Sequence, residues 1–209
     1  MKFKRAICYR VFHEMRTYDL DFIQVKVCVR GFPLTPKAKT TKGNCMAIYH
    51  CSTKTVNRSS GRTAVASMAY RAGEKLEDER TGLTHDFTKK DGVVHTEILS
   101  NLDIQIDRGE LWNLAEKSEN RKDARTAREW VIALPDELTA DQRKDVAKNF
   151  AQSIVDRYGV IADLAIHEPS KGGNDKNHHA HIMLTTRKAE LDPDNKLILT
   201  TKADIELSN

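Results

Sequence analysis

The sequence predicts an α+β fold in which an antiparallel central sheet carries helices packed on one face. Three observations predict this class. Strand-like and helix-like stretches follow one another in the order β-α-ββ-α-β-α-ββ. Most links between strands have the length and composition of hairpin turns. With 209 residues, the chain is also long enough to bury one hydrophobic core.

The first strand is expected within residues 46–56, where side chains alternate as in a half-buried strand. Residues 57–63, NRSSGRT, are typical of turns and helix caps. A helix is expected over residues 63–76, because its apolar side chains recur at helical spacing on one stripe. The stripe consists of Val65, Met68, Ala69, Ala72 and Leu76.

Residues 82–100 are expected to form a β-hairpin. Two β-rich runs flank Asp91-Gly92, a dipeptide that favours tight hairpin turns. A second helix is expected near residues 108–120, around the stretch GELWNLAEKS.

The strongest helix signal covers residues 139–159 and follows a strand expected over residues 127–135. Thr139 and Gln142 have the spacing of a capping box, and Gly159 stands where the helix should stop. Two more strands are expected over residues 161–169 and 178–187, with the polar loop SKGGNDKN between them, whereas the tail after Asp192 is weakly patterned.

By charge, the chain divides into a basic extension, residues 1–45, and a second part, residues 46–209. The extension holds 10 Lys and Arg against 3 Asp and Glu, whereas the remainder holds 24 against 27. Overall charge therefore does not indicate nucleic-acid binding, which would need a local basic face.

A cytoplasmic protein without membrane insertion is expected. No stretch approaches the roughly 18 to 20 apolar residues of a membrane helix. The N-terminus lacks the apolar core and cleavage site of a signal peptide. The four cysteines form no CxxC pair, and free thiols are expected.

Three histidines are candidate metal ligands. His179 and His181 are two residues apart in a predicted strand and therefore project from the same face, while His178 points away. His167 lies on the strand that the polar loop would bring alongside. Three imidazoles on one face would form a divalent-metal site with open positions, although an ordinary polar strand entry is an equally simple interpretation.

Tyr70 is a candidate nucleophile on the helix of residues 63–76. Arg71 is its neighbour, and Arg58 and Arg62 precede the helix. Cations beside a tyrosine favour its phenolate form, which is the stronger nucleophile. The alternative is a tyrosine that only packs on the helix surface.

Four blocks of the sequence together resemble the nicking domain of the MobA/MobL family of plasmid-mobilisation relaxases. They are MAIYHCSTKTVNRSSGRTAVASMAYRAG, EWVIALP, LAIHEP and NHHAHIML, in that order, between residue 46 and about residue 190. The resemblance extends to the wider HUH endonucleases, named for two histidines around one hydrophobic residue. It implies the relaxase architecture, a ferredoxin-like palm with the first strand central in its sheet.

The resemblance implies roles for individual residues. Tyr70 would attack a phosphodiester of single-stranded DNA, leaving a 5′-phosphotyrosine link and a free 3′-hydroxyl. His167, His179 and His181 would hold Mg²⁺ or Mn²⁺ near the phosphate. Glu129 would support the ligands or accept a proton, and no role is established for His50 on the first strand.

The expected partner is single-stranded DNA at a plasmid transfer origin, where nicking would start conjugative mobilisation. Relaxosome accessory proteins and a type IV coupling protein are implied by the resemblance alone. Contacts to DNA phosphates are expected from basic residues around the turn and the nucleophile, unless these are simply solvated charges. They are Lys54, Arg58, Arg62 and Arg71.

The resemblance also bears on the ends of the chain. Members of the family typically begin at the position of Met46, so residues 1–45 are either a fused basic arm or a start-site artefact, and we favour the artefact. Because relatives often continue into further domains, residues 46–209 are expected to be a relaxase domain that is either minimal or truncated.

Three other functions stay open. A rolling-circle replication initiator would use the same histidine pair, but generally places its tyrosine after the histidines. A non-catalytic remnant would bind DNA without nicking it. A small-molecule metallohydrolase would need neither Tyr70 nor the arginines.

Overall fold

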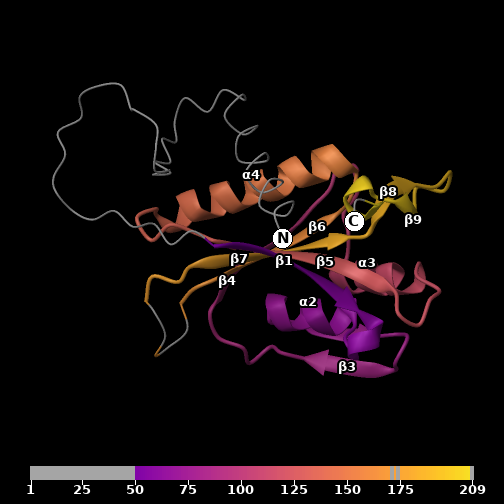
Figure 1. The fold of residues 1–209 in the computed structure, drawn as a ribbon, viewed down its shortest axis with the longest axis horizontal. Coiled ribbons are helices and arrows are strands. Elements are labelled where there is room, and N and C mark those ends of the chain that lie inside the picture. The colour runs from indigo at the N-terminus through magenta and orange to yellow at the C-terminus, as the bar shows by residue number, and fades with distance from the viewer. Residues whose placement is uncertain (1–49, 170–171, 173–174, 208–209) are drawn as a thin grey trace. The chain divides into compact units, whose positions relative to one another are not determined.

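A computed structural model of the chain describes residues 50–169, 172 and 175–207. Its centre is a five-stranded, fully antiparallel sheet with the strand order β1-β5-β7-β6-β4 (Figure 1). The strands are, in sheet order, β1 (Cys51–Asn57), β5 (Arg125–Ala133), β7 (His179–Thr185), β6 (Ala162–His167) and β4 (Val93–Leu99). This sheet confirms the predicted α+β class.

Helix α4 (Ala140–Tyr158) covers one face of the sheet. The predicted capping box is present, with Thr139 accepting from the backbone of Gln142, and Gly159 ends the helix in the left-handed conformation. The helix packs on the central strands, and the ring centroids of Phe150 and Trp130 are 5.7 Å apart. The buried side chains of α4 are Ala147, Phe150, Ala151, Ile154 and Val155.

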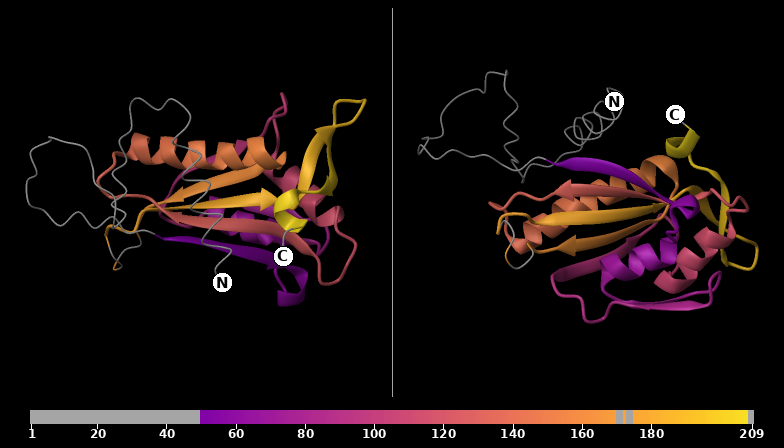
Figure 2. Two further views of the ribbon diagram at one scale, coloured as in Figure 1. Left: turned by 45° about the horizontal axis from the view of Figure 1, so that its top comes forward. Right: turned by 60° about the horizontal axis from the view of Figure 1, so that its bottom comes forward.

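Helices α2 (Ala64–Ala72) and α3 (Arg108–Lys117) cover the opposite face (Figures 1 and 2). The expectation of helices on one face only is therefore wrong. The strands present small or apolar side chains on both faces of the sheet, so helices can pack on each face. The second core includes Val65, Met68, Ala69, Leu111, Trp112 and Met183.

Helix α2 ends earlier than the sequence predicted. Thr63 caps its start, and Gly73 ends it with a φ of +67°, a conformation that glycine adopts without strain. The chain then enters strand β2 (Lys75–Asp78), which pairs with β3 (Leu83–Asp86) in a separate two-stranded sheet. Leu76 is buried as predicted, but it lies on a strand.

The predicted hairpin around Asp91-Gly92 is wrong, because its two runs pair elsewhere. The first run contains β3, which pairs with β2, and the second is β4, which pairs with β6. Gly92 does have a positive φ, but its carbonyl accepts a hydrogen bond from Glu168. Strand β6 is buried at every position, so it needs a strand partner on both edges, and β4 supplies one.

Strand β1 lies at the edge of the sheet, not at its centre as the resemblance implied. The central place belongs to β7, which is almost entirely buried, whereas β1 is mostly half-exposed. Cys51, at the start of β1, is disulfide-bonded, so the expectation of a free thiol is wrong there.

The weakly patterned tail contains regular structure. After Asp192 the chain forms strand β9 (Leu197–Lys202), which pairs in a hairpin with the preceding strand β8 (Arg187–Leu191), and then the short helix α5 (Asp204–Leu207). Among the described residues, no helix is both long and apolar enough to cross a membrane. The predicted extension, residues 1–45, lies outside the described residues.

Candidate metal centre and nucleophile

Strands β6 and β7 bring the three predicted histidines together. His167 and His179 are paired across the two strands, and His181 projects from the same face two residues later. The three ring centroids lie 4.7 to 5.3 Å apart. One nitrogen from each ring can be chosen so that all three lie within 4.8 Å of one another.

Each of these imidazoles has one nitrogen bonded to an oxygen that can only accept. His167 Nε2 donates to the Arg71 carbonyl at 2.7 Å, and His179 Nδ1 donates to the Asn177 carbonyl at 2.9 Å. His181 Nδ1 donates to Glu129 Oε1 at 2.6 Å. In the neutral rings the other nitrogen therefore carries a lone pair, as a metal ligand requires.

Burial keeps two of the three rings neutral. It lowers the pKa of His167 to about 4, since its bond to the Arg71 carbonyl offsets the loss of solvent only in part. Burial also lowers the pKa of His179, with a further contribution from the charge of His181. At neutral pH these rings do not need to lose a proton before they can bind a cation.

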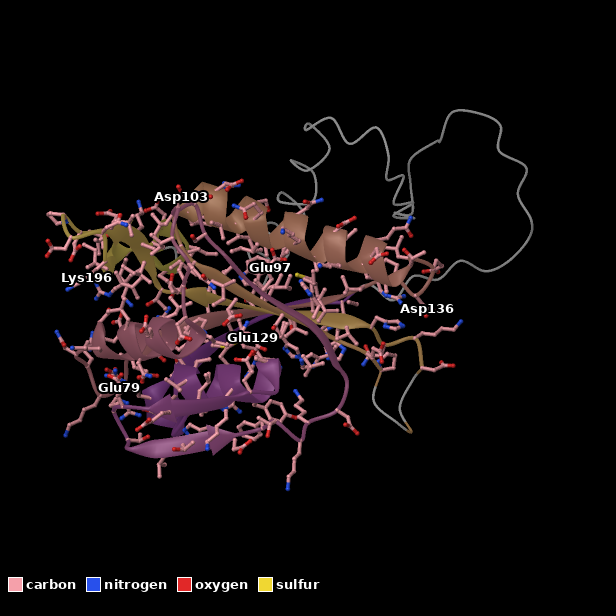
Figure 3. The ribbon with its side chains drawn as sticks, turned by 180° about the vertical axis from the view of Figure 1, so that it is seen from behind. Glu79, Glu97, Asp103, Glu129, Asp136 and Lys196 are labelled. Atoms are coloured by element: carbon pink, nitrogen blue, oxygen red, sulfur yellow. The ribbon has the colours of Figure 1, made fainter. Side chains whose placement is uncertain are left out.

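Glu129, on β5, lies between the central sheet and α2 (Figure 3), and it contacts both His181 and Arg71. Its buried carboxylate accepts from His181 and, at 2.5 Å for each oxygen, from Nε and Nη2 of Arg71. Burial alone would raise the pKa of Glu129, but the bonds from His181 and Arg71 outweigh it and lower the pKa to about 2. The carboxylate is therefore a fixed anion.

Tyr70 lies in the last turn of α2, and 52% of its surface is exposed. Its ring meets the edge of Phe87 with the two ring centroids 5.3 Å apart. Lys90 places its ammonium 3.9 Å from the centre of the Tyr70 ring. No feature of the sequence indicated Phe87 or Lys90, because both come close to Tyr70 only through the unpredicted path of the chain between β3 and β4.

Tyr70 and His181 line the same open groove, whose volume is about 870 Å³. Its other walls come from the turn before α2, the β2–β3 hairpin and the loop after α3. Six cationic side chains line it: Lys54, Arg58, Arg62, Arg71, Arg80 and Lys122. Four of them were predicted as phosphate contacts.

The four predicted basic residues differ in their surroundings. Lys54 and Arg62 are exposed, and Lys54 is paired with Glu129 across β1 and β5, so it lies on the face of the metal centre. Arg58 instead bonds Glu116 at 3.0 Å and the carbonyls of two following loop residues. Arg71 is held by Glu129, as described above.

Two other histidines lie apart from the cluster. His178 faces Asp136 at 3.5 Å, which agrees with its predicted direction away from the other three. His50 contacts the Ser52 hydroxyl at 3.2 Å and is absent from the described lining of the groove.

The sequence model of the MobA/MobL family matches residues 62–206, which include the nucleophile candidate, Glu129 and all three clustered histidines. The chain belongs to the MobA/MobL family. The resemblance seen in the sequence blocks is thereby confirmed.

Relatives in this family are named for mobilisation and conjugal transfer. The chain is 43% identical over 173 residues to "Mobilization protein MobL" of Acidithiobacillus ferridurans, covering 73% of the chain and 45% of the relative. It is 38% identical over 155 residues to "Conjugal transfer protein TraA" of Rhizobium radiobacter, covering 68% of the chain and 14% of the relative. The chain thus spans less than half the length of these relatives.

A solved structure supports the fold assignment. It is described as "Molecular Basis of Vancomycin Resistance Transfer in Staphylococcus aureus". Its TM-score is 0.64 at 33% sequence identity, over 76% of this chain and 79% of that one. The relaxase-type fold predicted from the sequence is therefore shown, with the strand placement corrected above.

Proposed function

We propose that this MobA/MobL chain nicks single-stranded DNA at a plasmid transfer origin, using Tyr70 as nucleophile and a metal held by His167, His179 and His181. One observation carries the proposal. His181, one of three clustered imidazoles, lines the same basic groove as the exposed Tyr70.

The donor set fits a divalent cation such as Mg²⁺ or Mn²⁺. Three nitrogens with fixed lone pairs leave open positions for phosphate oxygens. When bound, the ion would act as a Lewis acid and neutralise charge that develops on the non-bridging oxygens.

The reaction is a transesterification. The Tyr70 oxygen forms a bond to phosphorus while the bond from phosphorus to the 3′-oxygen breaks. The phenol proton passes to solvent and the departing 3′-oxygen takes up a proton, so atoms and charge balance. Because the bond is conserved as a 5′-phosphotyrosine ester, the reverse reaction can rejoin the strand.

Glu129 serves this site by orienting the groups around it. A carboxylate with a pKa of about 2 is a weak base, which argues against the alternative role as proton acceptor. Its bonds to His181 and Arg71 instead support a positioning role, in which one anion fixes both a metal ligand and the last turn of α2.

DNA would follow the basic groove. Lys54 and Arg62 are the predicted cations best suited to phosphate, because both are exposed. We add Lys122, which is also exposed, and Arg80, which is exposed but paired with Glu116 at 3.4 Å. Arg58 and Arg71 would act indirectly, since carboxylates and carbonyls of the protein already engage them.

In the cell, the nick would begin transfer of one plasmid strand. Relaxosome accessory proteins at the origin and a type IV coupling protein would be the protein partners. The names of the relatives support the role in mobilisation and conjugal transfer, whereas the two protein partners are implied by the family resemblance alone.

The test is covalent capture from a pool of randomised single-stranded DNA with Mn²⁺, followed by a denaturing gel. We expect a slower protein–DNA band that is lost with chelator and in Tyr70→Phe, but kept in the matched control Tyr158→Phe. Cleavage without an adduct, or cleavage that survives Tyr70→Phe, would contradict the proposal and favour a hydrolase. DNA binding without any cleavage would favour a non-catalytic remnant.

A further inference from the structure

Lys90 touches Tyr70 at two places. Its Nζ lies 3.9 Å from the ring centroid, within the range of a cation–π contact. The same ammonium donates a hydrogen bond to the Tyr70 carbonyl at 2.7 Å. One side chain thus holds both the ring and the backbone of the tyrosine.

Phe87 holds the ring at a second point. The two rings are almost perpendicular, at 89°, with the edge-to-face geometry that aromatic pairs prefer. A tyrosine as exposed as Tyr70 would otherwise be free to change rotamer at the mouth of the groove. Phe87 and Lys90 together therefore restrict the direction of the phenol oxygen.

The segment that carries these two residues is itself fixed on the end of α2. Phe87 N donates to the Glu74 carbonyl at 3.1 Å, and Lys90 N donates to the Phe87 carbonyl at 2.9 Å. At Gly73, a Cβ atom would come within 3.3 Å of Val93 and within 4 Å of the Phe87 and Lys90 carbonyls. The missing side chain at Gly73 thus permits this close approach.

Lys90 also lies within electrostatic reach of the metal centre. Its charge contributes to the lowered pKa values of both His167 and His179. Geometry agrees, because Lys90 donates to the carbonyl of Tyr70 and His167 donates to the carbonyl of the next residue, Arg71. A phosphate between nucleophile and metal would meet this cation.

We propose that Lys90, assisted by Phe87, is a positioning residue that aims the Tyr70 oxygen at the phosphate. This inference rests on the proposed function, because it assigns a step in the same reaction. Positioning acts on the rate of the bond-forming step more than on DNA affinity, since a misdirected nucleophile can still sit in an occupied groove.

The experiment compares Lys90→Met, Lys90→Arg and the neighbouring control Lys89→Met under single-turnover conditions. DNA recovered from the randomised pool is used, and affinity is measured separately by fluorescence anisotropy. We expect Lys90→Met to lower the rate of adduct formation at saturating DNA by at least about tenfold, with dissociation constants within about twofold. Lys90→Arg should recover most of the rate, and Lys89→Met should match the wild type.

Two outcomes would overturn the inference while the wild type still nicks DNA. In the first, Lys90→Met forms the adduct at the wild-type rate. In the second, it weakens binding but has the normal rate at saturation, which would make Lys90 a phosphate contact only.

A measurement without DNA separates this inference from the proposed function. Fluorotyrosine is incorporated, and the fluorine resonance of residue 70 is assigned by its loss in Tyr70→Phe. Lys90→Met should shift or broaden that resonance, whereas Lys89→Met should not. If the wild type fails to nick DNA, the proposed function fails, and an unchanged resonance would overturn the positioning role as well.

Discussion

His181 depends on Glu129 for its orientation as a ligand. The carboxylate fixes the proton on Nδ1 and leaves Nε2 free to bind a cation. Glu129 is also the main partner of Arg71, whose backbone carbonyl in turn accepts from His167. The buried anion thus bonds one clustered histidine directly and anchors the side chain of the residue whose carbonyl accepts from a second.

Replacement of Glu129 by Gln should weaken Mn²⁺ binding by about 10- to 100-fold, as loss of an outer partner of a metal-bound histidine typically does. The amide cannot supply the negative charge that holds both His181 and Arg71. Isothermal titration calorimetry at pH 7 measures the change, with the exposed Glu79→Gln as matched control. Equal Mn²⁺ affinity in wild type and Glu129→Gln would refute this role.

At this scale the sequence predicted the grouping of His167, His179 and His181, whereas the roles of Tyr70 and Glu129 stay predictions. The i, i+2 spacing of His179 and His181 determines their common face, and the short loop determines that His167 returns beside them. Phe87 and Lys90 could not be predicted in the same way. Their contact with Tyr70 depends on where β4 pairs, which is a long-range property of the sheet.

At the scale of elements, Glu119 joins the end of α3 to the C-terminal hairpin. Its Oε1 accepts from Arg187 at 2.8 Å and from Lys202 at 2.6 Å, on β8 and β9 respectively. Burial acts to raise the pKa of Glu119, but the bonds from Lys202 and Arg187 lower it overall from the ordinary value of 4.5. The ionised carboxylate therefore stabilises the folded state.

The sign of the pH dependence follows from that lowered pKa. The stabilisation is complete above pH 4.5, the ordinary pKa that Glu119 would have in the unfolded chain. It is lost as the pH falls through the lower pKa of the folded state. Glu119→Gln should reduce the free energy of unfolding by about 1–2 kcal/mol at pH 7 and by less in strong acid. Urea unfolding at several pH values measures this, with exposed Glu77→Gln as control. A difference that does not shrink in acid would contradict the ionic account.

Short sequence motifs predicted individual helices and strands better than they predicted which strands pair. The capping box of Thr139 and Gln142 marked the start of α4 correctly, because capping involves only neighbours in sequence. The Asp91-Gly92 signal failed, because the buried edge of β6 competes for β4 and outweighs a local turn preference. Gly73 could have indicated the end of α2, since glycine often follows the last residue of a helix. The helix was instead predicted to continue to residue 76, because Leu76 fits the helical spacing of the apolar residues.

On the scale of the whole domain, the two faces of the sheet have separate tasks. Helix α4 buries one face in an apolar layer, while the other face carries the clustered histidines, the proposed nucleophile Tyr70 and the basic groove. Charge is thereby concentrated where a nucleic acid would bind, even though residues 46–209 as a whole are slightly acidic.

This division predicts how salt affects DNA binding. The double variant Lys54→Gln, Arg62→Gln should bind an oligo(dT) strand with a weaker salt dependence. The slope of log affinity against log salt should fall in magnitude by about 1.4, because each lost phosphate contact on single-stranded DNA removes about 0.7. Fluorescence anisotropy across a salt series measures the slope. Lys144→Gln on α4, the helix of the opposite face, should leave it unchanged, and an equal effect of Lys144→Gln would argue against a local binding face.

If Tyr70 is the nucleophile, its phenol oxygen becomes bonded to DNA phosphorus. The most direct measurement is peptide mass spectrometry of the captured adduct after nuclease and protease digestion. We expect a nucleotide attached through phosphate to Tyr70, and to no other tyrosine of the chain. A nucleotide on another residue, or cleaved DNA with no modified peptide, would contradict it.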